Sequence, residues 1–225
     1  MRFITIWLIT TMAAAFPAQR ATTERFDYLV RADFFAGAAG DEARLAKAID
    51  LCERTLAENP SHAEAMVWHG AAVLVRSGQA FRAGDGANGG RLFQQGLDEM
   101  NKALEVKPDS PGVLIPRGAV LFEATRGMPA DLARPLIQSA IANYEHALEL
   151  QQPIWSSLGD HARGELLFGL AEGFARLGDQ AKARGYFDRL VADAPTSGQV
   201  PKAKEWIATG AVPKTNGTSC TGCHK

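Results

Sequence analysis

The chain has 225 residues, a formal net charge of −1 and 46% hydrophobic residues, which is enough for one domain with a sizeable core. The near-neutral charge argues against binding to nucleic acid or to an anionic membrane surface. Three cysteines are too few for a fold held together by disulfides. Abundant alanine, leucine and glycine with well-spaced prolines predict an all-α protein.

Residues 1–18 predict a secretory signal peptide. Arg2 supplies a positive charge, residues 3–12 form a short apolar run, and residues 13–15 offer small side chains for cleavage. The apolar run is too short to cross a bilayer comfortably. We therefore expect a periplasmic or otherwise exported protein with no membrane span after cleavage. An uncleaved N-terminal anchor is the alternative.

Residues 23–210 show helical periodicity and no good strand alternation. Four amphipathic segments each end at a proline, which cannot continue a helix. The leucines near these four ends are separated by 48, 44 and 42 residues, a period typical of helix-pair repeats. These leucines are Leu56, Leu104, Leu148 and Leu190.

The expected helices form four pairs and a final helix. Residues 27–38 and 42–58 make the first pair, and an insert at 78–91 stretches the turn of the second. The turn of the third pair holds Gly127, Met128 and Pro129. A helix at 202–209 would cover the end of the stack.

The fourth unit resembles a tetratricopeptide repeat. Small residues at fixed positions would let its two helices approach closely, and large ones would fill the gap between them. Gly178-Asp179 matches the turn of this repeat, although Leu190 is larger than the alanine usual at its place. The matching positions are Leu167, Leu170, Ala171 and Phe174 on the first helix, and Ala183, Phe187, Leu190 and Pro195 on the second.

This resemblance implies a solenoid of about four repeats with a capping helix, whose concave groove binds a partner protein. By the repeat register the groove is largely apolar, with Glu172 and Arg176 at one end. It would take an apolar partner segment or the chain's own tail; alternatively, the register is shifted and these residues form the core. The groove residues in this register are Val67, Ala71, Leu74, Ile115, Ala119, Phe122 and Phe168.

Two further features have structural interpretations. Gly84, Gly86 and Gly89 fit the pattern G-x-G-x-x-G, but no strand precedes them, so we expect a turn and no nucleotide site. Cys52 falls at a core position of its helix and is interpreted as a small buried apolar residue. No pair of catalytic acids or bases and no activated nucleophile stands out, so we expect no substrate chemistry.

The sequence Cys220-Thr221-Gly222-Cys223-His224 has the spacing of a c-type haem attachment site. Cys220 and Cys223 would form thioethers to the porphyrin, and His224 would be the proximal iron ligand. A disulfide, a redox dithiol or half of a zinc site are the alternatives. The second zinc ligand pair and the βαβ context of a thioredoxin-like motif are not found, so haem c is favoured.

Residues 211–225 predict a flexible linker followed by the haem tail. Only one residue follows His224, whereas a small cytochrome c supplies its distal methionine from the chain after this motif. A distal ligand would therefore come from the repeats or from another protein, and His161 is the first choice because it is nearest in sequence. The other candidates are His62, His69, His146, Met66, Met100 and Met128.

The sequence thus predicts an exported repeat protein that carries one haem c, transfers electrons and docks a protein partner through its repeats. A non-redox periplasmic scaffold with a tail disulfide is the main alternative. A second is a haem enzyme with peroxidase-like activity at an open iron site, for which no acid or base group is located.

Overall fold

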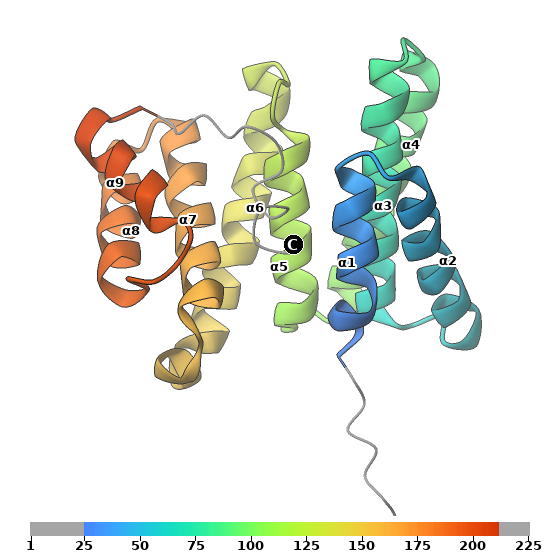
Figure 1. Ribbon diagram of the computed structural model, residues 1–225. Coiled ribbons are helices and arrows are strands. Elements are labelled where there is room, and N and C mark those ends of the chain that lie inside the picture. Colours follow the sequence, from blue (N-terminus) through green and yellow to red (C-terminus); the bar gives the residue numbers. More distant parts are fainter. Residues whose placement is uncertain (1–24, 212–225) are drawn as a thin grey trace, which may run out of the picture.

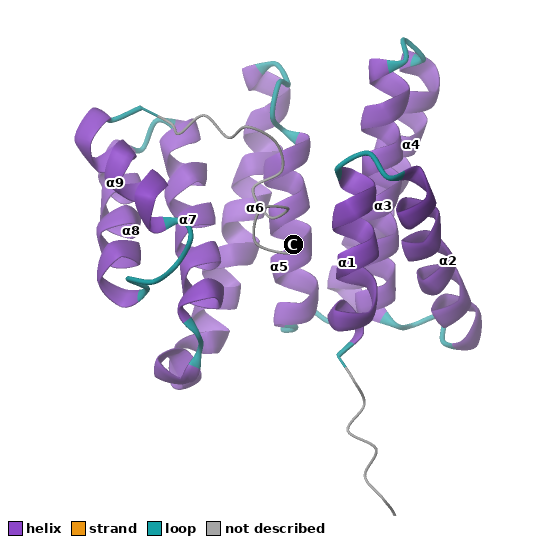
Figure 2. Ribbon diagram, viewed as in Figure 1, coloured by secondary structure: helices purple, strands orange, loops and turns teal. Residues whose placement is uncertain are grey.

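The computed structural model describes residues 25–211, and within this range the regular structure is entirely helical (Figure 2). The predicted signal peptide and the C-x-x-C-H sequence lie outside the described residues. Consecutive helices pack as pairs that stand side by side in a row, from α1–α2 at one end to α8 and α9 at the other (Figure 1). The prediction of an all-α solenoid of helix pairs is confirmed.

Four helix pairs and a final helix make up this row. Observed bounds match the expected ones to within one residue in the first pair, and the final helix begins two residues before the expected start. A short 3-10 helix, Gln152–Ser157, follows α6. The helices are α1 Phe26–Ala38, α2 Glu42–Glu58, α3 Ala63–Arg82, α4 Gly86–Val106, α5 Pro111–Ala124, α6 Ala130–Gln151, α7 Asp160–Leu177, α8 Gln180–Asp193 and α9 Val200–Thr209.

The turns inside three of the pairs follow one rule. A glycine in the left-handed region ends the first helix, and the next residue is an aspartate whose carboxylate accepts a hydrogen bond from the third backbone N–H of the second helix. The third pair differs, because Gly127 is followed by Met128, and α6 begins at Ala130 after Pro129 at the N-cap, which offers no side-chain cap. The regular turns are Gly40-Asp41, Gly84-Asp85 and Gly178-Asp179.

The expected long turn of the second pair is instead mostly helical. Helix α3 runs to Arg82 and α4 begins at Gly86, so the turn takes only residues 83–85. Two contacts hold the extended ends together: the Ser77 hydroxyl donates to the Gly89 carbonyl at 2.7 Å, and the Phe81 ring lies over Gly89. The glycines suggested a loop, but the contact between the two helices overrides their low helix propensity.

Glycines set the closest approaches between helices. A Cβ at Gly70 would lie 2.7 Å from the Gly96 carbonyl oxygen, and a Cβ at Gly96 would lie 2.7 Å from that of Gly70. The Tyr144 side chain fits between Gly118 on α5 and Gly169 on α7, where added Cβ atoms would come within 2.4 and 2.3 Å of its ring. At these positions the lack of a side chain on glycine lets neighbouring helices approach closely.

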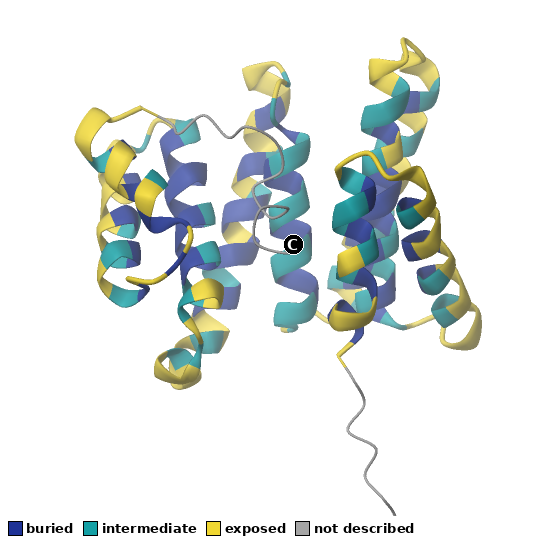
Figure 3. Cartoon of the chain, viewed as in Figure 1, coloured by how far each residue is buried: buried dark blue, intermediate teal, exposed yellow. Residues whose placement is uncertain are grey.

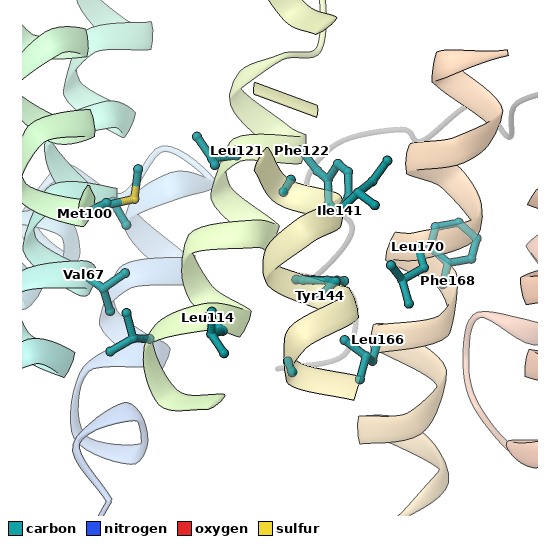
Figure 4. Close-up of a cluster of buried hydrophobic side chains, with 14 of the residues drawn as sticks. Val67, Met100, Leu114, Leu121, Phe122, Ile141, Tyr144, Leu166, Phe168 and Leu170 are labelled. Carbon is teal, nitrogen blue, oxygen red and sulfur yellow. The ribbon is translucent and has the colours of Figure 1, made fainter. Parts of the chain in front are cut away.

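The core runs along the inner faces of all the pairs (Figure 3). Figure 4 shows how successive helices contribute to it, from Met100 on α4 through Tyr144 on α6 to Leu170 on α7. The final helix covers the open end, because the Trp206 ring lies 4.7 Å from that of Phe187.

Cys52 is fully buried, and burial, followed by the charges of Glu53 and Glu99, raises the pKa of its thiol to about 12. It is therefore an unreactive core residue.

Packing is uneven around α5. This helix packs well on α6 and α3 but only slightly on α4 and α7, whereas α2 packs closely on α3 and α6 on α7. Space is therefore left beside the C-terminal half of α5, on the sides that face α4 and α7.

A candidate ligand cavity around α5

A cavity of about 1050 Å³ occupies this space. Its volume is at the upper end of the range of about 300–1,000 Å³ that is usual for ligand pockets. The walls come from α1, α3, α4, α5, α6 and α7, so all four helix pairs contribute to the cavity. The lining is mainly apolar. Its phenylalanines are Phe34, Phe35, Phe81, Phe93, Phe122 and Phe168.

Four of the predicted groove residues line this cavity. They are Leu74, Ala119, Phe122 and Phe168. Val67 and Ala71 instead lie fully buried between the helices, and Ile115 is half-buried against the core. The sequence did not indicate the walls from α4 and α6, because the predicted groove took its residues only from the first helices of the pairs.

A buried ion pair forms one end of the cavity. Glu172 on α7 has a side chain that is 5% exposed, and its Oε1 lies 2.7 Å from Nη2 of Arg126 in the α5–α6 turn. Arg126 Nε also donates to Glu123 at 2.8 Å. Burial alone would lower the pKa of Arg126, but the charges and hydrogen bonds of Glu172 and Glu123 raise it. The guanidinium therefore stays charged in the cavity wall.

Arg176, one helical turn after Glu172, supports the same α5–α6 turn. Its guanidinium donates to the Phe122 carbonyl at 3.0 Å and to the Thr125 hydroxyl at 2.8 Å. The sequence placed Glu172 and Arg176 together at one end of the groove. Their partners Arg126 and Thr125 were not foreseen, because nothing in the local pattern shows that the α5–α6 turn folds against α7.

A second carboxyl group, that of Glu165, lies in the wall next to Phe168 and close to the start of α9. Burial raises its pKa, against the opposing effect of the hydrogen bond that Gln199 Nε2 donates at 2.7 Å. This hydrogen bond ties α9 to the wall of the cavity.

The histidines proposed as distal haem ligands lie outside the cavity wall. His62 Nδ1 accepts a hydrogen bond from the Ala65 N–H and caps α3, and His146 contacts Asp109 on the surface. His161 is exposed at the start of α7, and His69 is paired with Glu99.

The methionines divide differently. Met100 is fully buried in the core, and Met66 is half-buried against it. Met128, in the irregular α5–α6 turn, lines the cavity. Of the seven candidate ligands, all of which lie within residues 25–211, Met128 alone belongs to the wall.

The His69–Glu99 pair links α3 to α4. Nδ1 of His69 lies 2.5 Å from Glu99 Oε2, and its Nε2 lies 3.7 Å from Glu53 on α2. The hydrogen bond to Glu99 raises the pKa of His69 above 6.5, although burial opposes it. Burial would raise the pKa of Glu99, but hydrogen bonds from His69 and Gln95 and the charge of His69 lower it.

We expect this pair to make stability depend on pH. A histidine whose pKa is raised on folding contributes its full stabilisation of the folded state at pH values below its unfolded pKa of about 6.5. That contribution is lost as the pH rises through the pKa of the histidine in the folded protein. His69→Gln should therefore cost about 1–2 kcal/mol at pH 6 and clearly less at pH 9. Urea unfolding of both proteins at the two pH values measures this, and an equal cost at both would contradict it.

Two features are absent from the part of the chain that the structure describes. Between residues 25 and 211, no three histidine, cysteine, aspartate or glutamate side chains are grouped so that they could hold a metal ion. None of the helices in the same range combines the length and the apolar character needed to cross a bilayer. Cys220, Cys223 and His224 lie beyond this range.

In comparisons with known proteins, no family model matches the chain and no curated protein is significantly similar to it.

Proposed function

We propose that this chain is an exported, tetratricopeptide-like repeat protein that carries one covalently bound haem c and transfers electrons, with its repeats docking a partner protein. The observation that carries the proposal is the complete sequence Cys220-Thr221-Gly222-Cys223-His224. The signal-like N-terminus agrees with it, because the c-type haem is attached outside the bacterial cytoplasmic membrane.

The donor set fits a haem c. Two thiols three positions apart can each form a thioether, and the adjacent imidazole can ligate the iron. A bound haem supplies one-electron chemistry at its iron. The chain's own residues anchor it through Cys220 and Cys223 and bind the metal through His224.

The absorption spectrum of the reduced minus the oxidised protein tests this proposal. The protein should be expressed with export and cytochrome maturation, and haem staining after denaturing electrophoresis shows whether the haem is covalent. We expect a covalent haem spectrum that Cys223→Ser alters or abolishes. Cys52→Ala is the matched control, because it removes the buried cysteine of the repeats and should leave haem content unchanged.

A protein without haem under these conditions would contradict the proposal. The main alternative is a non-redox periplasmic scaffold whose tail cysteines form a disulfide. A mass that rises by two on reduction, with no haem stain, would then support the scaffold.

A further inference from the structure

Met128 occupies an unusual place in the repeat array. The other three turns have an aspartate directly after the left-handed glycine, and that aspartate caps the next helix. In the α5–α6 turn the corresponding residue is Met128, its side chain lines the cavity, and α6 starts without a side-chain cap. When one turn departs from the pattern of the others at the wall of a cavity, the departing residue is a candidate for a function besides folding.

Two contacts from α7 hold the turn that carries Met128 in place. Arg126 pairs with Glu172, and Arg176 donates a hydrogen bond to Thr125. Both contacts are polar, and the residues that make them are buried or half-buried. Ligating residues need this kind of support, because a metal ligand functions only when its orientation is fixed. The thioether of Met128 is a soft ligand that suits a haem iron.

The chain's own tail can reach this cavity. Helix α9 begins beside the wall: Gln199 Nε2 lies 2.7 Å from Glu165, and Lys202 Nζ lies 5.5 Å from the centre of the Phe168 ring. From Lys202 to Thr209 the helix rises only about 10 Å. The nine Cα–Cα steps from Ala211 to Cys220 can span about 30 Å when extended. The haem-attachment cysteines are therefore within reach of the cavity.

We propose that the segment 212–225 folds back onto this cavity and that Met128 Sδ would supply a second protein ligand to its haem iron, besides His224. This rests on the haem attachment proposed above. The apolar wall would shield the porphyrin, and the groove residues Leu74, Ala119 and Phe122 would line a haem pocket. Methionine–histidine ligation and burial both raise the reduction potential of a haem.

Met128→Leu in the haem-loaded, full-length protein tests the ligand. Leucine keeps the apolar volume but removes the sulfur. We expect the sulfur-to-iron charge-transfer band of the oxidised protein to disappear, the midpoint potential to become more negative, and carbon monoxide to bind the reduced iron faster. Met66→Leu is the matched control, because Met66 packs against the core outside the cavity wall, and it should change none of the three.

Gly90→Trp tests the docking site independently. Gly90 lines the cavity, and a Cβ there would meet no atom within 4 Å, so a bulky side chain can be added at the wall without a clash at its Cβ. It should weaken the charge-transfer band as Met128→Leu does. Gly185→Trp, on the surface of α8 with the same open surroundings, should leave the band intact.

The outcomes separate the two proposals. Covalent haem whose spectrum and potential do not respond to Met128→Leu or Gly90→Trp would overturn the docking of the tail, while the haem-carrying function would stand. A protein that takes up no haem fails the staining test first, and both proposals then fall together.

Discussion

Replacing Gly169 with alanine should destabilise the protein by about 3 kcal/mol, although alanine is the better helix former by about 1 kcal/mol. The new methyl group would lie 2.3 Å from the Tyr144 ring, which is itself held against Gly118 on its other side. The ring cannot move away without a shift of α5 or α7. Overpacking of this kind in a rigid core is destabilising.

Denaturant unfolding of Gly169→Ala beside Gly185→Ala measures this effect. Gly185 is also helical, but a Cβ there meets no atom within 4 Å, so this control should gain about 0.5–1 kcal/mol. In a Tyr144→Ala background the cost of Gly169→Ala should largely disappear, because residues in contact do not contribute additively. Equal changes in the free energy of unfolding at Gly169 and Gly185 would show that the Tyr144 ring is not held tightly between its neighbours.

Replacing Glu172 with alanine should cost about 3 kcal/mol, because it leaves the half-buried Arg126 without its main countercharge. Arg176 lies nearby and adds a second positive charge, and burial lowers the pKa of that group. The α5–α6 turn should loosen, since Arg126 would no longer be tied to α7.

Glu123→Gln is the matched control for this prediction. Glu123 contacts the same Arg126 guanidinium, but it lies three residues away on the chain and is 41% exposed. Exposed pairs of this kind contribute less than about 1 kcal/mol. The double variant Arg126→Met, Glu172→Leu should be more stable than Glu172→Ala alone, because no unpaired charge remains buried. Equal losses for Glu172→Ala and Glu123→Gln in urea unfolding would contradict this account.

The sequence predicted the fold well because its information is local. Helical periodicity indicated the helices, and the proline after each second helix indicated where that helix ends. The prediction of a long turn in the second pair was wrong, because it relied on amino-acid composition alone. The glycine-rich stretch around Gly84 indicates a loop, but contacts such as Ser77 with Gly89 make it helical.

The cavity was harder to predict because it depends on how pairs pack on one another. Helical register placed Phe122 and Phe168 on its wall, but the same register included Val67 and Ala71, which are buried. The slight packing of α5 on α4 and α7 cannot be recognised from the sequence of any single helix. The choice of His161 as the distal ligand relied on its proximity to the tail in sequence. The packing of the helix pairs instead places Met128, and not His161, in the wall of the cavity.

A side-chain N-cap contributes about 1 kcal/mol to the start of its helix, and α6 begins at Ala130 without one, because its N-cap residue is Pro129. Its first turn should therefore fray more readily than those of α2, α4 and α8, and its amides should exchange with solvent sooner. This local opening lies next to Met128 in the wall of the cavity. We therefore expect hydrogen exchange to show local opening at this part of the wall while the helix pairs on either side stay folded.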